Sequence, residues 1–146
     1  MGDAFSKIIS ILLCVVMMFI IPVFYMREES ERITQTVILD EVTDFVDGVR
    51  NTGIISREDY LRLEKVLYNL GGAYRIEMVH SSHIYDEGGE SVLYFESENH
   101  KEQIMEEFQA GRDYFLSKYD YLRVVVRDRN DSVIAWYGGS VKYEAY

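Results

Sequence analysis

Residues 8–50 of the chain read IISILLCVVMMFIIPVFYMREESERITQTVILDEVTDFVDGVR and divide into two halves of different character. The first half, residues 8–26, contains no charged side chain. A helix of roughly 20 apolar residues is long enough to cross the ~30 Å hydrocarbon core of a bilayer. The run therefore predicts one membrane-spanning helix, for which we expect the lipid-facing set Ile8, Ile11, Leu12, Val15, Phe19, Pro22 and Phe24.

A cleaved secretory signal or a lipoprotein signal fits this run poorly. Only Lys7 and the α-amine provide positive charge before it, and bulky residues follow it. Lipid attachment at Cys14 would need a small preceding residue, but Leu13 stands there. We therefore expect a permanent anchor. Pro22 lies within it and is expected to bend the helix, either as a harmless kink near the interface or as a flexure that lets the helix pack in a bundle.

The second half predicts that the anchor helix continues beyond the membrane. Glycine and proline are absent from Met26 to Asp47, and apolar residues recur at helical spacing. Asn51-Thr52-Gly53 is expected to end the helix. This spacing begins at Ile33 and Val37, and the residues predicted to pack against a domain are Ile38, Val42, Phe45, Val46 and Val49.

Acidic residues lie on another face of this amphipathic segment. Asp40, Asp44 and Asp47 fall close together on a helix, and they are either a solvated face, a cation site or a docking patch. We take these three residues as the candidate partner surface.

The remaining sequence predicts two shorter helices. Ser56 has an acidic residue three positions on and can cap a helix that runs to Leu70. Asn99 can cap another, running to about Lys118. The apolar side of this later helix would consist of Ile104, Met105, Phe108 and Phe115.

Alternating and β-branched residues predict the strands. Residues 74–80 and 91–96, with turn residues at 86–89, suggest a hairpin, and residues 122–127, 132–137 and 140–146 suggest a meander. We therefore predict an α+β fold in which a long N-terminal transmembrane-plus-amphipathic helix packs on a small antiparallel sheet with two shorter helices. Residues 1–26 would form the membrane anchor and residues 27–146 an extracytoplasmic domain, with residues 27–51 continuing the helix.

Charge excludes some partners. Lys7 and Asp3 cancel in residues 1–26, so the whole net charge of −10 lies in residues 27–146. Nucleic acid is therefore an unfavourable partner. The distribution of positive charge around the anchor is nearly even. We expect a cytoplasmic amino terminus because a tail of seven residues rarely needs to cross, and this places the domain outside the cytoplasm.

Motifs for chemistry are weak. The only cysteine, Cys14, lies in the apolar run, so the domain can form no disulfide. His80-Ser81-Ser82-His83 would place two histidines on opposite faces of a strand, and Asp86-Glu87-Gly88-Gly89-Glu90 lacks the alternation of a calcium loop. No catalytic spacing occurs, so we expect no enzyme, no metal or other cofactor and no small-molecule substrate. Twelve tyrosines favour either half-buried strand positions or a protein contact surface.

Two longer segments carry a resemblance to a known family. Residues 45–56 read FVDGVRNTGIIS and residues 70–80 read LGGAYRIEMVH, followed by GRDYF at 111–115 and VVV at 124–126. This order resembles the TadE/TadF-like minor pilins of tight-adherence (Tad) pilus systems of Firmicutes, within the type IV pilin architecture. In one respect the chain differs. Lys7 stands fifth after Gly2, where substrates of prepilin peptidase usually carry glutamate.

The resemblance implies a minor pilin or pseudopilin-like structural component of a Tad-type pilus or related secretion assembly. Its partners would be membrane lipid, other pilin or pseudopilin subunits and membrane platform proteins. The alternative is a membrane-anchored extracytoplasmic protein-binding or sensor module unrelated to pili, which would use a tyrosine-rich sheet. A membrane-anchored hydrolase is a third hypothesis.

Overall fold

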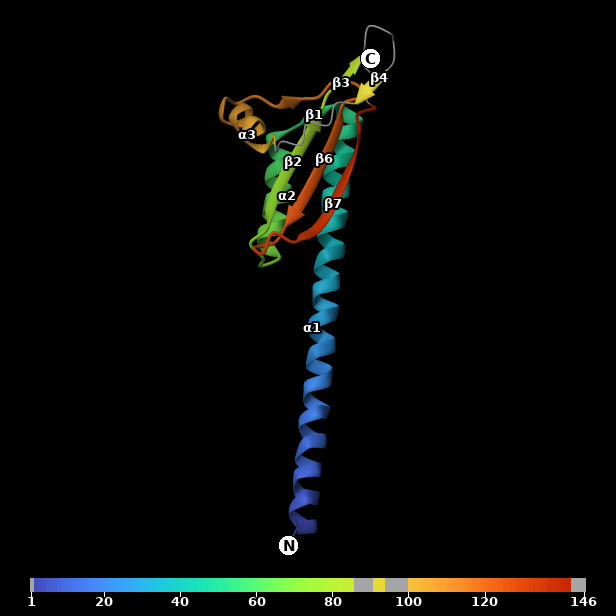
Figure 1. Ribbon diagram of the computed structural model, residues 1–146. Helices are drawn as coiled ribbons and strands as arrows, with labels where there is room; N and C mark the ends of the chain where they lie inside the picture. Colours follow the sequence, from blue (N-terminus) through green and yellow to red (C-terminus); the bar gives the residue numbers. More distant parts are fainter. Residues whose placement is uncertain (1, 86–90, 94–99, 143–146) are drawn as a thin grey trace. The chain divides into compact units, whose positions relative to one another are not determined.

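The computed structural model describes residues 2–85, 91–93 and 100–142 (Figure 1). Two compact units comprise Met1–Thr34 and Gln35–Tyr146. Helix α1 (Gly2–Thr52) runs through the boundary without a break, and Pro22 lies inside it. The predicted continuous helix is therefore confirmed. The first unit is helical at every described position and includes the change from apolar to charged sequence after Met26.

Helix α1 ends where the sequence predicts. Gly53 has a φ of +73°, a left-handed conformation that glycine adopts without strain. Its N–H donates to the carbonyl of Val49 over 2.7 Å, which satisfies one of the last carbonyl groups of the helix. The chain can then turn directly into the first short strand.

In its described residues, the second unit adds two helices and seven strands to the end of α1. The helices are α2 (Arg57–Asn69) and α3 (Lys101–Gln109). The strands are β1 (Ile54–Ile55), β2 (Arg75–Ser81), β3 (His83–Tyr85), β4 (Ser91–Leu93), β5 (Tyr114–Phe115), β6 (Tyr121–Arg127) and β7 (Val133–Ser140). The predicted cap of α2 is confirmed, because Ser56 Oγ accepts from the N–H of Asp59 over 3.1 Å.

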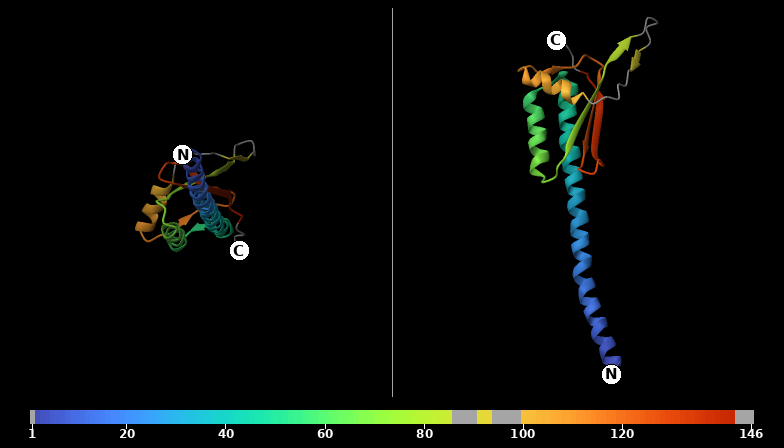
Figure 2. Two further views of the ribbon diagram at one scale, coloured as in Figure 1. Left: turned by 90° about the horizontal axis from the view of Figure 1, so that it is seen from below. Right: turned by 60° about the vertical axis from the view of Figure 1, so that its left-hand side comes forward.

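The main sheet has the antiparallel order β2-β6-β7. Helix α2 and the last turns of α1 lie side by side against one of its faces (Figures 1 and 2). The stripe of α1 that packs there consists of Ile38, Val42, Phe45, Val46 and Val49, all buried in one core cluster with Met78, Leu122 and Val124. The α+β class, with a long helix packed on a small antiparallel sheet, is therefore confirmed.

One strand partner differs from the prediction. β2 pairs with β6, so that Met78 lies opposite Val124, and among the described residues it does not pair with β4. The hairpin instead joins β3 to β4. The predicted turn at 86–89 and residues 94–96 lie outside the described residues. Strand pairing depends on contacts distant in sequence, and here Val124 and Val126 of β6 are buried in one core cluster with Met78 of β2.

The predicted helix 99–118 is too long. α3 ends at Gln109, and Gly111 has a φ of +74°, which a helix cannot continue through. Phe115 therefore belongs to β5, where it pairs with Ile54 and is 69% exposed. His100 occupies the N-cap without a side-chain capping bond, and Asn99 lies outside the described residues.

The end of the chain also differs. β7 passes through Gly138 and Gly139 to Ser140, where the sequence suggested a break. Beyond it, the N–H of Val141 donates to the carbonyl of Asp120 and that of Lys142 to the carbonyl of Arg50. The predicted strand 140–146 is thus replaced over residues 141–142 by irregular chain, and residues 143–146 lie outside the described residues.

Candidate functional site

The apolar part of α1 is the first candidate site. All seven residues predicted to face lipid are exposed, and the most apolar 18-residue window has a mean hydropathy of 2.8 with none of it buried. This helix is long and apolar enough to cross a membrane. Large apolar side chains exposed to water over so many consecutive positions would be costly, so this segment needs an apolar environment.

The candidate partner surface on α1 divides in two. Asp40 and Asp44 are exposed, and the structure gives neither of them an ionic partner among the residues that it describes. Asp47 is engaged within the domain, because its Oδ1 accepts from Arg50 Nη1 at 2.6 Å and from the hydroxyl of Tyr137 at 3.3 Å. Only the first two aspartates therefore remain available to a partner.

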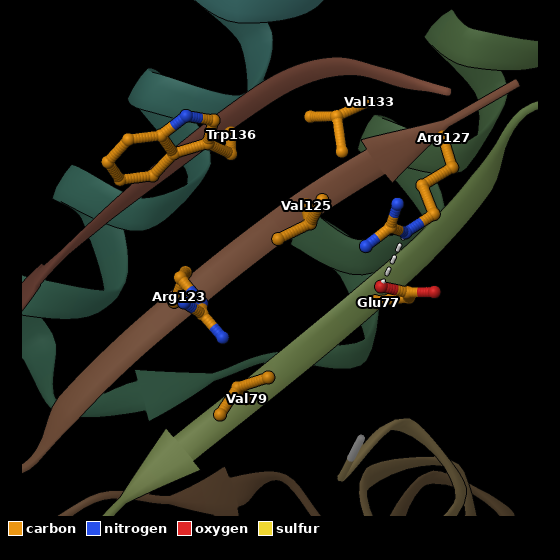
Figure 3. Close-up of a pocket in the computed structure, with 7 residues that line it drawn as sticks. All are labelled: Glu77, Val79, Arg123, Val125, Arg127, Val133 and Trp136. Carbon is orange, nitrogen blue, oxygen red and sulfur yellow. Dashed lines mark hydrogen bonds and ion pairs between the residues drawn. The ribbon is translucent and has the colours of Figure 1, made fainter. Parts of the chain in front are cut away.

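The outer face of the main sheet carries a feature that the sequence did not reveal. Side chains from all three strands line an open groove of about 360 Å³. Figure 3 shows these side chains on the sheet. The strand register explains why they meet. Glu77, Val125 and Trp136 lie opposite one another in one row across the sheet, and Val79 and Arg123 are paired in the next row. Val133 and Arg127 are paired with each other, and the row that contains Trp136 separates them from Val79 and Arg123.

Two arginines give the groove its charge. Arg127 Nε donates to Glu77 Oε2 over 3.0 Å, and this bond raises the pKa of Arg127 above its ordinary value. A second bond joins Arg127 Nη1 to the carbonyl of Asp131. Arg123 also lines the groove and is exposed, and within the described ranges no carboxylate pairs with it. The groove therefore presents one uncompensated positive charge on a strongly acidic chain.

Trp136 is the aromatic residue of the groove. It is the only tryptophan of the chain and is 58% exposed. None of the described tyrosines lines the groove; Tyr137, the neighbour of Trp136 in β7, is directed instead toward Asp47 and Arg50. The sequence pointed to the tyrosines as a class and not to Trp136. Alternation along residues 133–137 would have placed it opposite the core face, but a single strand does not show what lies beside it.

His80 belongs to a polar cluster inside the domain. Its Nε2 lies 2.9 Å from Asp120 Oδ2 and its Nδ1 lies 2.9 Å from the hydroxyl of Tyr114. A carboxylate only accepts, so in the neutral ring Nε2 carries the proton and Tyr114 donates to Nδ1. Asp120 Oδ2 also accepts from the N–H of Ser117 over 2.8 Å. The cluster ties β2 to β5 and to the loop before β6.

Metal binding gains no support from this cluster. Among the described residues, no group of three or more His, Cys, Asp or Glu side chains could hold a metal ion. His83 is in β3, and its side chain lies outside what the structure describes, as does the acidic segment 86–90. The hydroxyl of Ser81, although near His80 in sequence, is buried and has no hydrogen-bond partner in the described structure.

No family model matches the chain, and no curated protein or solved structure is significantly similar to it. Its function must therefore be argued from its own geometry. The features that bear on function are an apolar helix segment, two aspartates on the same helix, and a groove with an exposed tryptophan and an arginine; the structure, where it describes the chain, gives these aspartates and Arg123 no ionic partner.

Proposed function

We propose that the chain is a single-pass protein of the plasma membrane and a non-enzymatic, minor-pilin-like subunit of a Tad-type pilus or a related secretion assembly. Its amino terminus would lie in the cytoplasm and residues 27–146 outside it. The observation that carries the proposal is that one unbroken helix supplies both the apolar segment and the central packing stripe of an α+β domain.

This arrangement suits a subunit that assembles through its helix. Helices in lipid associate by packing, and residues 8–26 expose only apolar side chains together with Ser10, Cys14 and Tyr25. A cleavable signal would not need to continue into the core of the domain that it exports. The resemblance at residues 45–56 and 70–80 suggests the class of assembly. The first segment covers the end of α1 with β1, and the second covers the turn after α2 and most of β2.

Membrane fractionation and gene deletion test the proposal together. The full chain is expected to stay with membranes after alkaline carbonate washing, and protease added to cells with a permeable outer surface is expected to cleave within residues 60–146. Deletion is expected to reduce pilus assembly, adhesion or secretion. Wild-type pili in the deletion strain would reject the pilus role, and protection of the domain from protease would reject the orientation.

A membrane-anchored binding module unrelated to pili remains the second candidate. The groove around Trp136 favours it, because an exposed tryptophan beside an arginine is typical of protein recognition. Neighbouring genes separate the two candidates. An assembly ATPase and platform membrane proteins favour the pilus role, whereas a kinase or a transporter favours the module.

A further inference from the structure

The groove on the outer sheet face lacks complementary groups in the described part of its own chain. Trp136 exposes more than half of its surface, and Arg123 has no carboxylate partner among the described residues. Tryptophan and arginine are the residues that most often dominate the energy of a protein contact. A ligand for this groove should therefore offer an aliphatic side chain and a carboxylate at close spacing.

The exposed face of α1 offers those two groups. Leu39 is 42% exposed, and Asp40 and Asp44 beside it are exposed without ionic partners in the described residues. Like charges four residues apart repel each other along a helix. An arginine from outside would relieve this repulsion, so the aspartates and Arg123 are complementary.

The two surfaces lie at the same level along α1. Trp136 precedes Tyr137, whose hydroxyl bonds to Asp47 on α1. Asp47 is about one helical turn from Asp44. The groove and the segment 39–44 therefore lie at a similar height in the domain, so the segment of one copy can reach the groove of a parallel neighbour without a large axial shift.

We propose that the groove lined by Arg123, Val133 and Trp136 binds residues 39–44 of α1 from a second copy of this chain. Leu39 would pack on Trp136 and Val133, and Asp40 or Asp44 would pair with Arg123. The inference rests on the proposed function in one respect, since anchoring holds copies parallel in one membrane. Anchoring also concentrates them, which a contact of this small size needs.

The contact joins two different surfaces, so it is heterologous. Each copy keeps a free groove at one side and a free helix face at the other, and addition can continue to a row of subunits. A symmetric dimer would instead place the same residues opposite each other. This difference gives the proposal a direct test.

Cysteine cross-linking between differently tagged copies tests it. The full chain is used in membranes, with Cys14→Ser as background, and one tagged copy carries Leu39→Cys while the other carries Val133→Cys. A disulfide requires Cα atoms within about 7 Å, so oxidation is expected to join the two tags. Copies that all carry Leu39→Cys, or all carry Val133→Cys, are expected to form no disulfide-linked dimer. The matched control is Leu61→Cys with Val133→Cys, because Leu61 is similarly exposed but lies on α2.

Charge reversal adds a second measurement. Arg123→Glu in the copy with Val133→Cys is expected to reduce cross-linking at least about tenfold, and Asp40→Arg with Asp44→Arg in the other copy is expected to restore it. Restoration would not follow if Arg123→Glu merely disturbed the fold. The proposal is overturned by control cross-linking equal to that of Leu39→Cys, by cross-linking insensitive to charge reversal, or by Val133→Cys joining only to a different protein.

Failure of this contact can be told from failure of the proposed function. A chain that is membrane-bound and required for pili, but shows no joined tags, would reject the contact and leave the function standing. Joined tags in a strain whose pili do not need the chain would reject the pilus role and leave the contact standing.

Discussion

The hydroxyl of Tyr137 donates to Asp47 Oδ1 over 3.3 Å and joins β7 to the last turns of α1, 90 positions earlier in the chain. Arg50 completes the link, because its Nη1 bonds to the same carboxylate oxygen and its Nε donates to the carbonyl of Ser140. The guanidinium end of Arg50 lies so close to Gly139 that a side chain at this position would have to displace it. A strand edge is thus held to the helix by polar contacts outside the apolar core.

Asp47→Ala is expected to destabilise the domain by about 1 kcal/mol, because it removes two part-buried hydrogen bonds to one carboxylate. Urea unfolding of the full chain in detergent, followed by the fluorescence of Trp136, measures the change. Asp44→Ala, one turn earlier and exposed, is the matched control and should stay within about 0.5 kcal/mol of the parent. Equal effects of the two substitutions would contradict the link.

Phe45→Ala is expected to cost about 3–5 kcal/mol, since Phe45 is buried in the core and truncation leaves a cavity. Phe115→Ala makes the same substitution at another position and serves as the control. Phe115 lies exposed in β5, so its truncation is expected to cost about 0.5 kcal/mol or less. A large loss from Phe115→Ala would indicate a buried helical position, as the sequence first suggested. Unfolding midpoints of the two variants decide between these outcomes.

Asp120→Ala is expected to cost about 2 kcal/mol. The carboxylate of Asp120 is buried, and its removal leaves the N–H of Ser117 without its acceptor and His80 Nε2 without its carboxylate. Asp40→Ala, at an exposed position, serves as the control. Asp120→Asn retains one acceptor oxygen and should lie between them. An unfolding free energy of Asp120→Ala indistinguishable from that of the control would show that the cluster does not stabilise the fold.

Tyr60→Phe is expected to alter the response to alkali. Burial, with a further contribution from the nearby charge of Glu64, raises the pKa of Tyr60 to about 12. An unfolded tyrosine titrates near 10. Between these values the unfolded state loses the proton while the folded state keeps it, so the folded state binds more protons and the unfolding free energy falls as pH rises.

Removal of the hydroxyl should therefore reduce the loss of stability between pH 10 and about 12, relative to the parent. Below pH 10 the variant is expected to be as stable as the parent or up to about 1 kcal/mol more stable, because the buried hydroxyl has no hydrogen-bond partner among the described residues. Tyr68→Phe, at a solvent-exposed tyrosine, should leave the alkaline profile unchanged. Unfolding midpoints measured at several pH values give the comparison. Parallel profiles for Tyr60→Phe and the parent would argue against the raised pKa.

Val15→Arg is expected to weaken membrane insertion, since an arginine in the middle of a spanning helix costs about 3 kcal/mol. The share of the chain that remains with carbonate-washed membranes measures this effect. Ile33→Arg places the same charge on α1 beyond the apolar run and is expected to leave membrane association intact. Loss of association in both variants would mean that the second substitution acts on something other than insertion.

Local patterns were sufficient for some elements. The change at Met26 from an uncharged run to an amphipathic one, together with the glycine at 53, predicted α1 and its end, and Ser56 predicted the start of α2. Gly111 also carried information, because its positive φ ends α3 near Gln109. The end of α3 was nevertheless not predicted, because a glycine inside a helical pattern can be either a weak helix residue or a stop.

Pairing between distant strands could not be read in the same way. The alternation of apolar and polar residues over 75–81 is compatible with more than one partner strand. The observed register is selected by the surface that this strand buries together with β6. The groove follows from that register, because it places Trp136, Val125 and Glu77 in one row. No property of Trp136 alone would have located it beside Arg123.

The sequence by itself determined the long helix, its apolar and amphipathic halves and the α+β class, because hydropathy and helical period are properties of neighbouring residues. Tertiary structure alone decided that Asp47 is held within the domain while Asp40 and Asp44 remain free of ionic partners among the described residues, and that one sheet face presents a groove. These outcomes depend on which distant segments share buried surface and hydrogen bonds. The free energy of those contacts is gained only when the chain folds and brings the segments together.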